Sequence, residues 1–155
     1  IAKNGGIALQ VIWIAIIVAI IDQISKILVV SSLKPHDSIP IIQNIFHITY
    51  VQNTGAAFSV LRGRTYFFIL VSSLMIIAII YFAQRIPRNK KLLRLMLGFV
   101  LGGAVGNLID RIRLGFVVDF FDFRIWPVFN VADSAVVVGM IVVAYCLIND
   151  PELKF

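Results

Sequence analysis

The stretch Val11–Ile21, which reads VIWIAIIVAII, contains only apolar residues, and mainly apolar residues continue on both sides of it from about Ile7 to Val30. A helix needs about 20 mainly apolar residues to cross the hydrocarbon core of a bilayer. The stretch therefore predicts a membrane-spanning helix over about 7–30. Three further segments have the same character, and they lie at about 65–83, 92–109 and 131–148.

The composition indicates the same class of protein. Of 155 residues, 60% are hydrophobic and 14% charged, whereas soluble domains are typically about 45–50% apolar and about 25% charged. We predict an all-α membrane protein with one domain: a bundle of four transmembrane helices and a small extracytoplasmic β-sheet between helices 1 and 2. The first apolar run lacks a small-residue cleavage site, so we expect no cleavable signal peptide.

Basic residues set the predicted orientation. The segment Arg85–Arg94 holds five of them and no acid, which is typical of a cytoplasmic loop. Four spans then place both termini in the cytoplasm and the loops 31–64 and 111–130 outside. The net charge of +6 is interpreted as membrane orientation and contact with anionic lipid, and not as nucleic-acid binding, because the Lys and Arg residues lie between apolar runs.

The first outer loop and the third apolar segment carry further signals. Residues 45–51 are rich in β-branched and aromatic side chains and predict a strand. Asn53-Thr-Gly55 predicts a turn, and a short helix or turn is expected near 56–61. In the segment 92–109, glycines spaced by four residues would allow another helix to approach closely; they are Gly98, Gly102 and Gly106.

Acidic residues gather on one side of this topology. Five of the eight acids lie in the outer half of a helix or in an outer loop, and three asparagines lie beside them. Ionisable groups in hydrocarbon are costly, so they indicate a functional site. We therefore predict one polar site at the outer membrane boundary, formed by Asp22, Asp110, Asp119, Asp122 and Asp133 with Asn53, Asn107 and Asn130.

Several of these residues also have simpler interpretations. Asp22 and Lys26 are four apart and could form a plain helical ion pair. Asp110 and Arg111 could simply mark the end of a helix. Asn130 and Asp133 could be an N-cap of the fourth helix and have no other role. Asp122 is best interpreted as a solvated loop charge. The two histidines have no Cys or Glu nearby, so no metal site is predicted, and no serine has a partner that would make it a nucleophile.

Asp119 and Asp133 are the best candidates for a catalytic pair. Two neighbouring carboxylates do not both ionise easily, so one retains a proton while the other stays charged. Such a pair supplies a base that activates water and an acid that protonates a leaving amine. Asn130 lies one helical turn before Asp133 and could orient it. The positions of the residues in the sequence do not by themselves establish that the two aspartates meet.

Five sequence blocks, taken together, resemble the lipoprotein signal peptidase (signal peptidase II) family over essentially the whole chain. The blocks are Asp22-Gln-Ile-Ser-Lys26, Asn53-Thr-Gly-Ala-Ala-Phe58, Gly106-Asn-Leu-Ile-Asp-Arg111, Val117-Val-Asp-Phe120 and Phe129-Asn-Val-Ala-Asp-Ser134. The resemblance implies that Asp119 and Asp133 are the catalytic dyad. It implies supporting roles for Asp22, Asn53, Asn107, Asp110, Arg111 and Asn130. The family more often has Thr at the position of Ser25.

The resemblance also implies a reaction. The family cleaves the signal peptide of bacterial prolipoproteins just before a cysteine that carries diacylglycerol. The expected protein is thus an aspartic endopeptidase of the bacterial cytoplasmic membrane that needs no cofactor or metal. Its partners would be the diacylglyceryl-modified prolipoprotein and membrane lipid, and a monomer is expected. An interfacial belt or lid is expected from Phe120, Phe121, Phe123 and Trp126.

Two other classes fit parts of the pattern. A small proton-coupled transporter would need acids that continue through the bilayer, but here they stay on the outer side. A non-enzymatic membrane scaffold could use the glycine-spaced helix as an interface, but this would leave the polar cluster unexplained. A proteolysis assay on a lipid-modified peptide, with and without Asp119, distinguishes the three.

Overall fold

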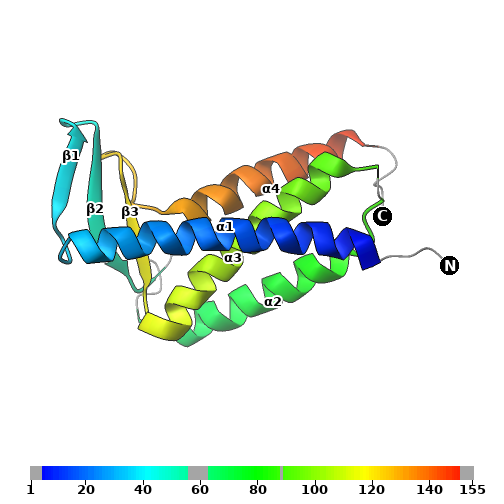
Figure 1. The fold of residues 1–155 in the computed structure, drawn as a ribbon, viewed down its shortest axis with the longest axis horizontal. Helices are drawn as coiled ribbons and strands as arrows, with labels where there is room; N and C mark the ends of the chain where they lie inside the picture. Colours follow the sequence, from blue (N-terminus) through cyan, green and yellow to red (C-terminus); the bar gives the residue numbers. More distant parts are fainter. Residues whose placement is uncertain (1–4, 56–62, 88, 151–155) are drawn as a thin grey trace.

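The computed structural model describes residues 5–55, 63–87 and 89–150. Within them, four helices form a bundle, and a three-stranded sheet lies beyond one end of it (Figure 1). Helix α1 begins, and helix α4 ends, at the opposite end of the bundle (Figure 1). The elements in chain order are α1 (Gly5–Ser32), β1 (Ser38–Ile42), β2 (Phe46–Asn53), α2 (Thr65–Ala83), α3 (Lys91–Leu114), β3 (Val117–Asp122) and α4 (Val131–Asn149).

Each helix is long and apolar enough to span a membrane. Large aliphatic side chains remain exposed on the outside of the bundle, for example Ile17, Ile77 and Ile141, which are 55%, 63% and 64% exposed. In water such a surface would be unfavourable, but in a bilayer it faces lipid acyl chains. The predicted fold class, a four-helix membrane bundle with a small sheet, is confirmed.

Helix α3 is central to the bundle and packs closely against α1 and α4, as its glycine spacing predicted. A Cβ atom on Gly98 would lie 2.6 Å from Cβ of Ile14, and one on Gly102 would lie 2.6 Å from the backbone oxygen of Ala15. A Cβ atom on Gly103 would collide with the backbone of Ala132 in α4. Helices in lipid associate through such close backbone contacts.

The sheet joins the segment between α1 and α2 to the segment between α3 and α4. Its order is β1-β2-β3 and both pairs are antiparallel. The prediction placed the sheet wholly between helices 1 and 2, and this was incomplete, because β3 comes from the loop after α3. In the register of β2 and β3, Val51 is opposite Asp119 and Asn53 is opposite Val117. The sheet thereby carries Asn53 toward Asp119.

Two other predictions about this end of the molecule were wrong. Helix α3 does not end near Asp110 and Arg111. It continues to Leu114, and Gly115 follows in the left-handed conformation (φ 81°), which is common after the last residue of a helix. Phe120 is not part of an interfacial belt, because it is 3% exposed and packs with Val29 and Tyr50 between α1 and the sheet. The segment 56–61, for which a short helix or turn was predicted, lies outside the described residues.

Candidate active site

A cavity of about 840 Å³ opens between α2, α3, α4 and the last residues of β2. Both Asp119 and Asp133 line it, together with Asn53, Asn107 and Arg111. The rest of its wall is largely apolar, with Met75 of α2 and residues 136–138 of α4. The cavity thus combines a polar end with an apolar side, within the span of the helices.

Asp119 lies in the middle of β3 and is 1% exposed. Asn130 Nδ2 donates to its Oδ1 at 2.7 Å, and Asn53 Nδ2 donates to its Oδ2 at 2.9 Å. Burial, and next the charge of Asp133, raise the pKa of Asp119 to about 7, although the two amide donors oppose this shift. A carboxyl group in this state can take up or release a proton near neutral pH.

Asp133 lies in the first turn of α4. It forms a capping box with Asn130: the Asp133 N–H donates to Asn130 Oδ1 at 2.8 Å, and the Asn130 N–H donates to Asp133 Oδ2 at 3.3 Å. The capping interpretation is therefore confirmed. The same Asn130 side chain also reaches Asp119, so one asparagine contacts both aspartates. Asn107 Nδ2 donates to Asp133 Oδ1 at 2.7 Å.

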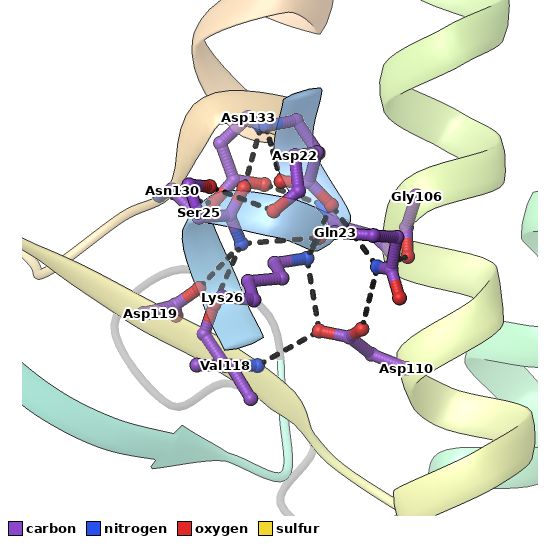
Figure 2. A network of polar contacts seen from close by, with 12 residues as sticks. Asp22, Gln23, Ser25, Lys26, Gly106, Asp110, Val118, Asp119, Asn130 and Asp133 are labelled. Carbon is purple, nitrogen blue, oxygen red and sulfur yellow. Dashed lines mark hydrogen bonds and ion pairs between the residues drawn. The ribbon is translucent and has the colours of Figure 1, made fainter. Parts of the chain in front are cut away.

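A second polar group lies beside these two aspartates and is shown in Figure 2. Lys26 Nζ of α1 contacts Asp22 Oδ2 at 2.8 Å and Asp110 Oδ2 at 2.9 Å. Gln23 Nε2 donates to Asp110 Oδ1 at 2.9 Å. Asp22 and Lys26 are therefore more than a local ion pair, since the pair connects α1 to α3.

Arg111 lies on the cavity side of α3. Its guanidinium group is 5.1 Å from the ring centre of Phe68, and its Nη2 donates to the Gly55 carbonyl at 3.4 Å. Its charge interacts with those of Asp133, Asp119 and Asp110. Among the described residues that line the cavity, it is the one cation, and a guanidinium group can donate to carbonyl or carboxylate oxygens.

The predicted dyad and all six predicted supporting residues lie in this region. Asp122, which was interpreted as a solvated loop charge, is not solvated. It is 5% exposed in β3, accepts from Thr49 Oγ1 at 2.8 Å and pairs with Arg124. It is therefore a buried structural carboxylate. Sequence reasoning also gave Gln23 no role and Lys26 only that of an ion-pair partner. The signal was present, because three polar residues, Gln23, Ser25 and Lys26, follow Asp22 within about one turn of a largely apolar helix.

Comparison with known proteins gives the family. The family model described as signal peptidase (SPase) II matches residues 14–149. The chain belongs to the signal peptidase II family. A lipoprotein signal peptidase of Halothermothrix orenii is 51% identical over 126 residues, which are 81% of this chain and 86% of the relative. One of Desulforapulum autotrophicum is 43% identical over 154 residues, covering 94% and 95% of the two chains.

A solved structure of a bacterial membrane enzyme, determined by the in meso method at 2.3 Å resolution, has the same fold. It has a TM-score of 0.85 and 34% sequence identity, and the match covers 94% of this chain and 91% of the other. As a member of the signal peptidase II family, this multi-pass membrane protein is a peptidase. The cavity with its buried carboxyl groups is the candidate site for that activity.

Proposed function

We propose that this protein removes the signal peptide of bacterial prolipoproteins by hydrolysing the peptide bond before a diacylglyceryl-modified cysteine, with Asp119, Asp133 and a water molecule. The observation that carries the proposal is that two carboxyl groups line one cavity and share one asparagine. Its family membership supports the peptidase activity and the class of substrate.

The reaction needs one ionised and one protonated carboxyl group. The ionised one takes a proton from water as the water oxygen bonds to the scissile carbonyl carbon, and the protonated one donates its proton to the carbonyl oxygen. The tetrahedral intermediate then collapses: the carbon–nitrogen bond breaks, the amine takes a proton from the first carboxyl group, and a hydroxyl proton returns to the second. We assign these roles to the pair, since coupled carboxyl groups titrate together.

The surroundings of the dyad fit a lipid-bound substrate. The cavity lies within the membrane-spanning part of α3 and α4 and has an apolar side, which suits acyl chains and a signal helix that remain in the bilayer. Asn53 and Arg111 would contact the peptide backbone. In this proposal the cavity faces the outer side of the cytoplasmic membrane, and the loop 85–94 is cytoplasmic.

The test is cleavage of a diacylglyceryl-modified prolipoprotein peptide by the purified protein in lipid nanodiscs, with the products identified by mass spectrometry. We expect one cut before the modified cysteine, much slower cleavage of the same peptide without lipid, and no cut by Asp119→Asn. Asp122→Asn, three residues along the same strand and outside the cavity, is the matched control. A cut elsewhere, or equal cleavage with and without lipid, would refute the proposed substrate.

A further inference from the structure

Lys26 is a buried cation that does not line the cavity. It belongs to the membrane-spanning helix α1 and is 3% exposed. Its ammonium group has three acceptors: Asp22 Oδ2 at 2.8 Å, Asp110 Oδ2 at 2.9 Å and Asn107 Oδ1 at 3.0 Å. An ammonium group has three protons, so every one of them can be used by this set of contacts.

The two carboxylates that Lys26 contacts hold the backbone immediately before each aspartate of the proposed dyad. Asp110 Oδ2 accepts from the N–H of Val118, which precedes Asp119, at 3.0 Å. Asp22 Oδ1 accepts from the N–H of Ala132, which precedes Asp133, at 2.9 Å. Strand β3 and helix α4 are thereby connected to one ammonium group, each through a single carboxylate (Figure 2).

The third proton of Lys26 controls the orientation of Asn107. The Oδ1 atom of Asn107 accepts from Lys26 Nζ and also from Asn130 Nδ2 at 3.1 Å. Two donors on this atom fix which end of the amide is oxygen, so Nδ2 must point the other way. It points to Asp133 Oδ1, at 2.7 Å.

We propose that Lys26 is a positioning residue: one buried ammonium group sets the relative placement of β3 and α4, and orients Asn107, so that the two carboxyl groups meet in reactive geometry. The inference rests on the proposed function. Buried ion pairs are often no more stabilising than apolar side chains of the same size, so a role in stability alone does not account for this arrangement. Misplacement of reacting groups by about 1 Å can lower a rate roughly 100-fold.

The experiment measures kcat and KM for Lys26→Met, Asn107→Ala and the double variant on the lipid-modified peptide, at a temperature well below each melting point. We expect Lys26→Met to lower kcat by roughly 10–100-fold and to change KM by less than about 3-fold, because Lys26 does not line the cavity. In the Asn107→Ala background the same substitution should have a clearly smaller effect, because residues that act together are not additive. Ser25→Ala is the control, since within the described part of the chain its hydroxyl group bonds to the carbonyl of Asp22 in its own helix and to no other group.

If Lys26→Met does not fold, the same comparison of single and double variants is repeated with Lys26→Gln, which keeps an N–H donor but removes the charge. A kcat near the wild-type value in the folded variant would overturn the inference. The inference would also be overturned if the kcat losses of the Lys26 variant and of Asn107→Ala were fully additive in the double variant, because additive losses would indicate independent structural effects. Failure of the proposed function would instead appear as cleavage that does not depend on Asp119, whatever residue occupies position 26.

Discussion

Asp119→Asn should remove activity and yet make the protein more stable at alkaline pH. The folded protein holds the pKa of Asp119 at about 7 through burial and the nearby charge of Asp133, whereas an unfolded aspartate has a pKa of about 3.9. A group whose pKa is higher in the folded state than in the unfolded state contributes its full stabilisation at pH values below its unfolded-state pKa. That stabilisation is lost as the pH rises through the folded-state pKa. At pH 8 Asp119 is therefore ionised in the folded protein, and the fold is less stable than it would be with Asp119 protonated.

The size of the effect follows from the two pKa values. A roughly 1,000-fold difference in proton affinity corresponds to about 4 kcal/mol at pH 8. An asparagine avoids this cost, but its amide nitrogen cannot accept from Asn53 or Asn130, which both donate to Asp119. Loss of one such acceptor costs about 1–3 kcal/mol. We therefore expect a net gain of about 2 kcal/mol at pH 8 and none near pH 5.

The assay is thermal unfolding in detergent, followed by tryptophan fluorescence between pH 5 and pH 8. A gain of about 2 kcal/mol should raise the melting temperature by roughly 4–8 °C for a chain of this size. The control is Asp122→Asn. Burial acts to raise the pKa of Asp122, but hydrogen bonds from Arg124 and Thr49 outweigh burial and lower it, so this variant should lose stability at pH 8. If Asp119→Asn were less stable than the wild type at pH 8, or equally affected at all pH values, the reasoning would be wrong.

Three further predictions concern the helices, the chemistry and the topology. Gly102→Leu should destabilise the fold by about 1–3 kcal/mol through overpacking, because α1 leaves no space there for a side chain; thermal unfolding measures this, and an unchanged melting temperature would contradict it. Cys146→Ser and chelators should leave most cleavage activity intact, whereas loss with EDTA that one metal restores would refute a carboxylate-only mechanism. In the Cys146→Ser background, an impermeant thiol reagent should label Trp126→Cys from outside and Asn89→Cys only after permeabilisation, and the reverse pattern would invert the topology.

The spanning helices could be predicted because each is an apolar run of about 20 residues, which a soluble fold of this size could not bury. The end of α3 could not be predicted, because Asp110 and Arg111 interrupt the apolar run in the sequence. In the structure, Asp110 is buried and pairs with Lys26, so this acid lies within the helix and does not mark its end. Strand β3 was also missed. Its residues are buried on both faces, apart from the half-buried Phe121, so it shows no alternation of polar and apolar side chains.

The candidate site could be predicted as a set of residues, because the acids and asparagines fall on one side of the topology. Their individual partners could not be predicted. The contact between Thr49 and Asp122 joins residues 73 positions apart, and nothing local in the sequence marks it. The three contacts of Lys26 likewise depend on the depth at which α1 packs against α3, which the spacing of polar residues does not specify.

The most direct test of the account is turnover of the lipid-modified peptide by Asp119→Asn, Asp133→Asn and the double variant, each shown to be folded and free of wild-type enzyme. Each single variant should lose at least roughly the 10²–10⁴-fold that acid–base catalysis contributes. The double variant should be little worse than either, because the two carboxyl groups act as a unit. Near-native turnover by either single variant would contradict the assignment of Asp119 and Asp133 as the catalytic dyad.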